Sequence, residues 1–118
     1  MEIVNRKDSK LLGRTEVKVL FAGKSGAINR KEAIAEVAQA LNSSEGKVAL
    51  VRLSPQAGSR NLIGWFHVYD SPEGRKELSH DYLSVRLLTK EEKEARKAAK
   101  KKAEAAAAAA AAPAPKKK

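Results

Sequence analysis

The sequence predicts an α+β fold. We expect a β-β-α-β-β plait, with a four-strand, mainly antiparallel sheet packed against one main helix, and an extended basic helix at the C-terminus. Four short segments rich in β-branched and aromatic residues, bounded by turn formers, predict the strands. Apolar residues at helical spacing between the second and third strands predict the packed helix. The final part of the chain, rich in Ala, Lys and Glu, predicts the basic helix.

The first two strands are expected at residues 2–7 and 14–23, joined by a polar loop. One face of the second strand consists of Thr15, Val17, Val19 and Phe21. Glu16 and Lys18 alternate with these residues, a pattern typical of a strand that is buried on one side. The two strands should therefore pair antiparallel and direct one face toward the core.

The packed helix is expected to begin after Asn29, a favourable N-cap residue, with Glu32 three residues later as in a capping box. Apolar residues then follow at spacings of three and four: Ile34, Val37, Ala38 and Leu41. Such a stripe lies on one side of a helix, so we expect it to cover one face of the sheet. The polar stretch "NSSEG" ends the helix.

The last two strands are expected at residues 47–53 and 62–70, separated by the turn-rich loop "SPQAGSRN". A short helical turn should follow Ser71, because the next residue is Pro and suits the first helical position. An extended segment is expected at residues 82–88. A body of this size buries only about 60% of the surface of its unfolded chain, so a large partner should stabilise it.

The C-terminal helix is expected to run from Lys90 to Ala112, where Pro113 ends it. Thr89 and Glu92 have the spacing of a capping box at its start. The helix contains no Leu, Ile, Val or Phe with which to dock on the rest of the chain, so it should extend away as an arm. We therefore expect a plait domain at residues 1–88 and a helical arm at residues 89–118, with flexible last residues.

Charge is concentrated in this arm. The whole chain has 24 Lys and Arg, 14 Asp and Glu, and a net charge of +10. Residues 89–118 contain ten basic and four acidic residues, a net charge of +6. Such asymmetry favours a polyanionic partner, which would be a nucleic acid, an acidic membrane surface or an acidic protein. The plainer alternative is a highly charged, solvated surface.

Several classes of function find no support. The chain has no cysteine, its N-terminus lacks the apolar core of a signal peptide, and no run approaches the roughly 20 apolar residues of a membrane span. We expect a soluble, cytoplasmic protein. Only His67 and His80 could serve as acid or base near neutral pH, and neither has a recognisable partner spacing. "GKSGA" lacks the spacing of a phosphate-binding loop. We expect no enzyme, cofactor, metal site or small-molecule substrate.

The fourth strand is apolar on both faces, and one helix covers only one of them. The second face carries Ile63, Trp65, His67 and Tyr69. Aromatic residues on an open sheet stack on unpaired bases in some RNA-binding proteins. The alternative, which we favour at this point, is that the segment "DYLSVRLL" (81–88) covers this face.

Basic residues at loops, element ends and along the arm are the candidate residues for binding a nucleic acid, RNA or DNA. Lys and Arg in such places contact phosphates without reading sequence. Two of them, Arg30 and Lys31, lie where a helix N-terminus offers backbone N–H groups to a phosphate. For any single residue, solvated loop charge is the alternative. The candidates are Arg6, Lys7, Lys10, Arg14, Lys24, Arg30, Lys31, Arg60, Arg75, Lys76, Arg86, Arg96, Lys97, Lys100 and Lys101.

Three stretches, "LLGRTEV", "NRKEAIAEVAQALN" and "GWFHVYDSPEG", resemble the archaeal and eukaryotic small-subunit ribosomal protein family numbered twenty-four. The resemblance runs from Met1 to about Arg86 and rests on the order and spacing of these pieces. It implies an α/β plait that binds ribosomal RNA in the small subunit, beside neighbouring ribosomal proteins. The loop before the fourth strand departs from the family pattern, since it keeps only Gly58 and Arg60. The tail is variable in the family.

The expected function is therefore that of a structural, RNA-binding constituent of the small ribosomal subunit, active in translation. The alternative is a protein-interaction module whose basic helix binds an acidic partner. A membrane-surface helix is disfavoured, because no large apolar residues lie opposite the lysines of the arm.

Overall fold

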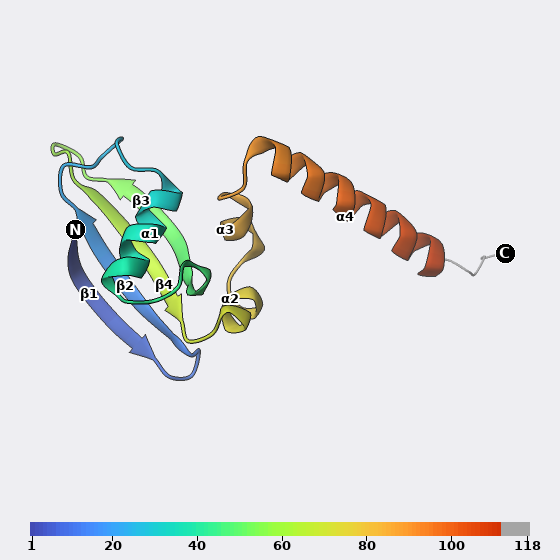
Figure 1. Cartoon of the computed structure of the whole chain (residues 1–118), viewed down its shortest axis with the longest axis horizontal. Coiled ribbons are helices and arrows are strands. Elements are labelled where there is room, and N and C mark those ends of the chain that lie inside the picture. Colours follow the sequence, from blue (N-terminus) through green and yellow to red (C-terminus); the bar gives the residue numbers. More distant parts are fainter. Residues whose placement is uncertain (112–118) are drawn as a thin grey trace. The chain divides into compact units, whose positions relative to one another are not determined.

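Four strands form one antiparallel sheet in a computed structural model that describes residues 1–111 (Figure 1). The strands are β1 (Glu2–Ser9), β2 (Arg14–Phe21), β3 (Val48–Pro55) and β4 (Leu62–Tyr69). Their order across the sheet is β1-β2-β4-β3, with β2 and β4 at the centre. All three pairings are antiparallel. The predicted α+β plait is confirmed.

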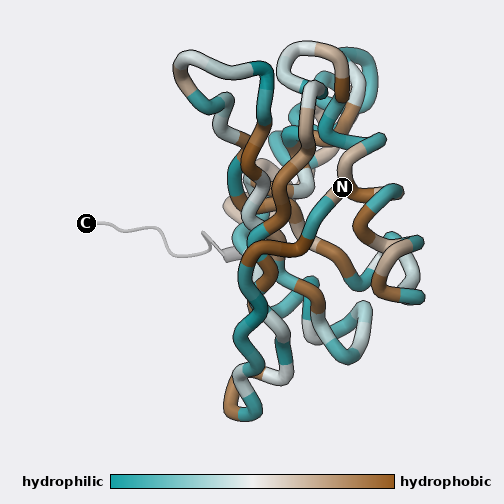
Figure 2. The backbone as a smooth tube through the Cα atoms, turned by 90° about the vertical axis from the view of Figure 1, so that its left-hand side faces the viewer, coloured by the Kyte–Doolittle hydropathy of each residue, from teal (hydrophilic) through white to brown (hydrophobic). Residues whose placement is uncertain are grey.

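Short helical segments connect or follow the strands in the first part of the chain. They are α1 (Arg30–Ala40), the 3-10 turn η1 (Glu45–Lys47), α2 (Pro72–Leu78) and α3 (Asp81–Val85). The chain divides into two units, Met1–Leu87 and a second that begins at Leu88 and contains α4 (Lys90–Ala111). Figure 2 shows strongly hydrophobic stretches along the strands of the first unit.

The core lies between α1 and one face of the sheet. In the central strand β2, Val17, Val19 and Phe21 are buried on this face. Phe66 of β4 meets Phe21 edge to face, with ring centroids 6.2 Å apart. From α1 the core receives Ala33, Ile34, Val37 and Ala38. The predicted apolar stripe of α1 is confirmed, and Leu41 packs against the core as a partly buried residue.

The N-termini of α1 and α2 have the caps that their sequences predict. The backbone N–H of Asn29 donates to the Glu32 carboxylate at 2.9 Å, which is one half of the capping box of α1. Ser71 accepts a hydrogen bond from the Gly74 N–H at 3.0 Å, and Pro72 occupies the first position of α2. The helical turn expected after Ser71 is therefore present.

The extended segment predicted at residues 82–88 is wrong, because α3 and a turn occupy this region. The physical reason is the spacing of its leucines. Leu83 is buried and Leu87 packs against the core, and a helical turn brings residues four apart to the same side. An extended chain would carry them much farther apart along its length.

The described part of α4 ends at Ala111, so the predicted end of the helix and the flexibility expected for the last residues lie outside the described residues.

Gly64 provides a sharp test of the packing. A Cβ added there would lie 2.5 Å from Cε2 of Phe66 and 3.1 Å from Cδ2 of Leu53. Phe66 is fully buried and has no room to move away. Gly64→Ala should therefore lower the free energy of unfolding by about 1–3 kcal/mol in urea denaturation. Gly46→Ala is the control, since nothing lies within 4 Å of its added Cβ; equal stability of the two variants would contradict this packing.

Candidate nucleic-acid interface

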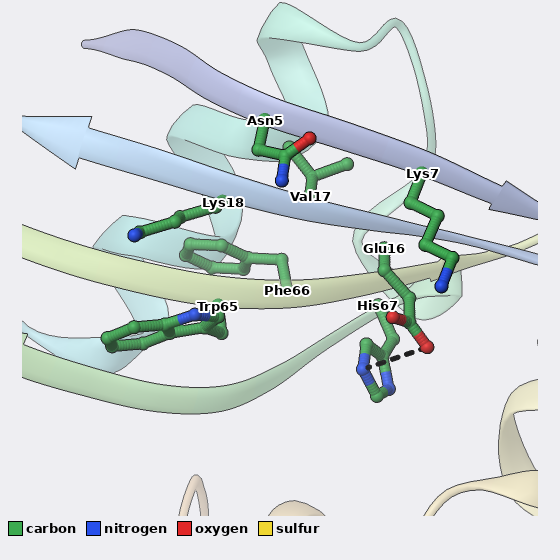
Figure 3. Close-up of a pocket in the computed structure, with 8 residues that line it drawn as sticks. All are labelled: Asn5, Lys7, Glu16, Val17, Lys18, Trp65, Phe66 and His67. Carbon is green, nitrogen blue, oxygen red and sulfur yellow. Dashed lines mark ion pairs between the residues drawn. The ribbon is translucent and has the colours of Figure 1, made fainter.

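The outer face of the sheet, opposite α1, carries the side chains that alternate with the core residues. Figure 3 shows Lys7, Glu16, Lys18, Trp65 and His67 on the same side of the sheet, from β1, β2 and β4. The expectation that residues 81–88 cover this face does not hold at its middle. Tyr69 is 2% exposed, but Trp65 and His67 stay half-buried and line an open hollow.

One end of the outer face is an internal polar cluster around Arg14. Its guanidinium binds the Glu16 carboxylate at 2.8 Å and donates to the Tyr69 hydroxyl at 3.5 Å. The hydrogen bond from Arg14 lowers the pKa of Glu16, although partial burial opposes this shift. His67 Nε2 lies 3.9 Å from the Glu16 carboxylate. Arg14 is thus engaged within the protein, whereas the sequence indicated only a basic loop residue.

The middle of the outer face places two cations against the indole of Trp65. Lys18 Nζ lies 5.6 Å from the ring centroid and the Arg52 guanidinium carbon lies 5.5 Å from it. The strand register explains this, since Lys18 and Arg52 are both paired with Trp65, one on each neighbouring strand. Neither cation was among the sequence candidates. Alternation along the fourth strand indicated that Trp65 faces outward, but its cross-strand neighbours depend on register.

A β-bulge explains the position of Arg52. Leu50 pairs with Phe66 on the core side, and the register then shifts so that Arg52, rather than Val51, pairs with Trp65. Simple alternation from Leu50 would direct Arg52 toward the core. The bulge turns Arg52 outward and returns Leu53 to the core side, where it packs as a partly buried residue.

Three of the candidate cations come together beside the start of α1. Arg30, Lys31 and Arg86 are exposed and line one shallow depression with Leu87. The free N–H groups of the helix are partly used already, because the Glu32 carboxylate accepts from the Asn29 backbone. Phosphate binding here would therefore depend on the three side chains more than on the helix terminus.

The other candidates of the first unit divide by whether they have partners. Arg6 lies 3.6 Å from Asp8, and Lys24 Nζ lies 2.6 Å from the Glu36 carboxylate. Arg75 donates to the carbonyl oxygens of Glu45 and Gly46, at 3.5 and 3.1 Å, and burial lowers the pKa of its side chain. Arg75 therefore fixes η1 to α2. Among residues 1–87, the candidates without an ion pair or side-chain hydrogen bond are Lys7, Lys10, Arg30, Lys31, Arg60, Lys76 and Arg86.

Two loops bring further cations to one end of the sheet. The Ser25 N–H donates to the Arg60 carbonyl at 3.0 Å, and the Gly23 N–H donates to the Asn61 side chain at 3.3 Å. These bonds hold the segment after β2 against the loop between β3 and β4. Arg60 thus lies beside the loop that carries Lys24.

The second unit presents basic residues on one side of a helix. Thr89 and Glu92 form the predicted capping box: the Thr89 N–H donates to the Glu92 carboxylate at 2.7 Å, and the Glu92 N–H donates to the Thr89 hydroxyl at 3.4 Å. Steps of three and four residues then place six cations on one broad face of α4. They are Lys90, Lys93, Arg96, Lys97, Lys100 and Lys101. Among residues 1–111, no helix is both long and apolar enough to cross a membrane.

The His67 imidazole predicts a pH dependence of stability. Burial, followed by the positive charge of Arg14, holds its pKa below the ordinary value of 6.5. The unfolded chain therefore binds this proton more readily than the folded chain. The stability that neutral His67 contributes is present above pH 6.5 and is lost as the pH falls through its folded pKa.

Urea denaturation should accordingly give a lower free energy of unfolding at about pH 5 than at neutral pH, and His67→Gln should reduce that difference. The lowered pKa of Glu16 acts in a more acidic range, below its ordinary value of 4.5. His80→Gln, at an exposed histidine, is the control variant. If His67→Gln keeps the pH dependence of the parent chain, His67 is not the group responsible.

Comparisons with known proteins identify the family of the first unit. The family described as Ribosomal protein S24e matches residues 1–88. A protein of Methanosphaerula palustris named small ribosomal subunit protein eS24 is 31% identical over 93 residues, which are 79% of this chain and 95% of that protein. Proteins of the same name from Haloquadratum walsbyi and Haloarcula marismortui are 26% and 25% identical. Those matches cover 73% and 83% of this chain, and 82% and 98% of those proteins. The match to the family takes in the whole sheet and all helices before α4, and the chain therefore belongs to the ribosomal protein S24e family.

Proposed function

We propose that the chain is a structural constituent of the small ribosomal subunit that binds ribosomal RNA through exposed cations of its folded body and through the basic face of α4. The family is one of ribosomal proteins, not of enzymes. The observation that carries the RNA contact is the meeting of Arg30, Lys31 and Arg86, from segments far apart in the sequence, in one exposed depression.

The mechanism is electrostatic and geometric. Arg and Lys that contact phosphates release condensed counterions, and this supplies affinity without sequence readout. Cations held by a rigid body fix the orientation of that body on the RNA. Those without acidic partners in the body are the most effective, because binding then breaks no internal ion pair. Arg6, Lys24 and Arg14 should contribute less, since Asp8, Glu36 and Glu16 already neutralise them.

The arm adds a second basic surface. Its cations follow one another at helical spacing, while alanines occupy most of the remaining positions. Small side chains allow a helix to approach a groove or backbone closely, and they give it no apolar stripe for a membrane. RNA phosphates are therefore the partner that fits this helix best.

The exposed edge of the sheet is available for a neighbouring ribosomal protein. β1 is an edge strand and is exposed along almost its whole length. Ile3 and Val4 are 42% and 53% exposed, and Leu11 in the following turn is 95% exposed. Unpaired edge strands and apolar turns of this kind are usual points of contact with other chains. We assign this edge, rather than the cationic surfaces, to protein neighbours.

Sedimentation of native cell extract through sucrose gradients, at low and moderately high salt, tests the assignment to the subunit. The protein should travel with the small subunit at both salt concentrations. Release into the top fractions under gentle conditions would favour the alternative, in which α4 binds an acidic protein.

The cations beside α1 should determine the salt dependence of RNA binding. Arg30→Gln/Lys31→Gln/Arg86→Gln should weaken binding to small-subunit ribosomal RNA and flatten the slope of log K against log salt, by roughly 0.7–0.9 for each phosphate that the variant no longer neutralises. The control Arg6→Gln/Lys24→Gln/Lys47→Gln removes the same charge from sites outside the depression. An equal effect of both variants would mean that net charge alone, and not this cluster, governs binding.

Removal of residues 89–118 should separate folding from binding. The described core lies wholly within Met1–Leu87, so the truncated chain should keep its urea midpoint. Its RNA affinity should fall steeply at low salt, because the net charge of +6 is removed with the arm. Unfolding of the truncated chain would show that the arm stabilises the body, contrary to this proposal.

A further inference from the structure

We infer that the outer sheet face around Trp65 is a stacking site for an unpaired nucleotide of RNA. The inference deepens the proposed function and rests on it. The proposed ligand is a base with an unstacked face. The proposed site consists of four residues that are not among the candidate phosphate-binding residues: Trp65, Lys18, Arg52 and Asn5.

The aromatic platform is the first part of the site. Trp65 stands on the central strand β4, half-buried, with its ring on the side of the sheet away from α1 (Figure 3). Because β4 is paired on both sides, the backbone that carries Trp65 is held in place by two ladders. Asn5, Lys7 and His67 line the same open hollow. Stacking on such a platform is available to every base, because every base has a π face.

The two cations are the second part. Lys18 and Arg52, on the strands that flank β4, each lie over the Trp65 ring within 6 Å of its centroid, so a stacking base takes the place of one of them on the ring. Within residues 1–111, neither forms an ion pair, and Glu16, an acid that lines the same hollow, is bound by Arg14. Two like charges around one ring repel each other, and a phosphate placed beside the ring would relieve that repulsion. An aromatic face flanked by unneutralised cations thus matches one base together with its own phosphate.

Charge and geometry decide between possible occupants. A protein helix or strand without acidic residues would bury Lys18 and Arg52 without neutralising them, which is costly. Duplex RNA offers phosphates but keeps its bases stacked on one another, so it satisfies only the cations. Among RNA elements, only an unpaired nucleotide satisfies both parts of the site. The occupant is therefore a nucleotide in a loop, bulge or single-stranded segment.

The single tryptophan of the chain allows a direct test. A short single-stranded oligoadenosine RNA, titrated into the full-length protein, should quench the Trp65 fluorescence, because stacking brings a base against the only indole. Duplex RNA with the same number of phosphates should bind with much less quenching. Binding of single strands that leaves the Trp65 emission unchanged would overturn the inference while the proposed function stands. A chain that binds no RNA at all would overturn both.

Variants separate stacking from charge, with binding measured by anisotropy of a labelled oligonucleotide. Trp65→Leu should weaken single-strand binding roughly five- to hundredfold, and Trp65→Phe should recover most of it, because phenylalanine keeps a stacking face. Ile63→Leu, on the same face of the same strand, should bind as the parent chain does. If Trp65→Leu binds single strands normally but fails to enter the small subunit, this face docks a protein and the inference is wrong.

The flanking cations need their own control. Lys18→Gln/Arg52→Gln should weaken single-strand binding more than Lys47→Gln/Lys102→Gln, which removes the same charge elsewhere. Duplex binding should change to a similar degree in both double variants. An equal weakening of single-strand binding would assign Lys18 and Arg52 to general attraction and overturn their place in the site.

Discussion

The unbroken pairing of β2 with β4 is the constraint on which the rest of the structure depends. The ladder runs without a bulge from Arg14 opposite Tyr69 to Phe21 opposite Leu62. In an antiparallel ladder, this register decides which side chains share a face. It assigns Val17 and Phe66 to the side of α1, and Lys18 and Trp65 to the outer side. A slip by one residue would move the core to the surface and bury the polar face.

Much of this could be predicted from the sequence, because local signals were strong. Both capping boxes, the proline at the first position of α2, and the apolar stripe of α1 are short-range patterns that the structure confirms. The order of elements followed from them. The failure at residues 82–88 also has a local cause: a stretch rich in Leu and Val indicates a strand, whereas the burial of Leu83 and Leu87 beside the core favours a helical turn.

The candidate interface was less predictable, because it depends on which residues become neighbours across strands. The basic composition indicated a polyanion, but it did not separate cations with partners from those without. Arg75 fixes η1 and Arg14 binds Glu16, and both roles depend on tertiary structure that composition does not contain. Conversely, the sequence did not indicate Lys18 and Arg52 as site residues, because only the strand register places both beside Trp65. The meeting of Arg86 with Arg30 and Lys31 likewise requires the fold.

The bulge at Val51 has a consequence for how the length of β3 can vary. Side chains along a strand point alternately to the two faces of the sheet. The extra residue between Leu50 and Arg52 reverses this alternation for the residues that follow it. Deletion of Val51 alone would leave a regular strand in which Arg52 still faces outward and Leu53 still faces the core. Insertion of one residue after Leu53 would instead reverse the faces of all later residues of the strand, unless a second bulge absorbed it. β3 can thus lose one residue without a change in which residues face the core, whereas the loop at 56–61 has no alternation of faces to preserve.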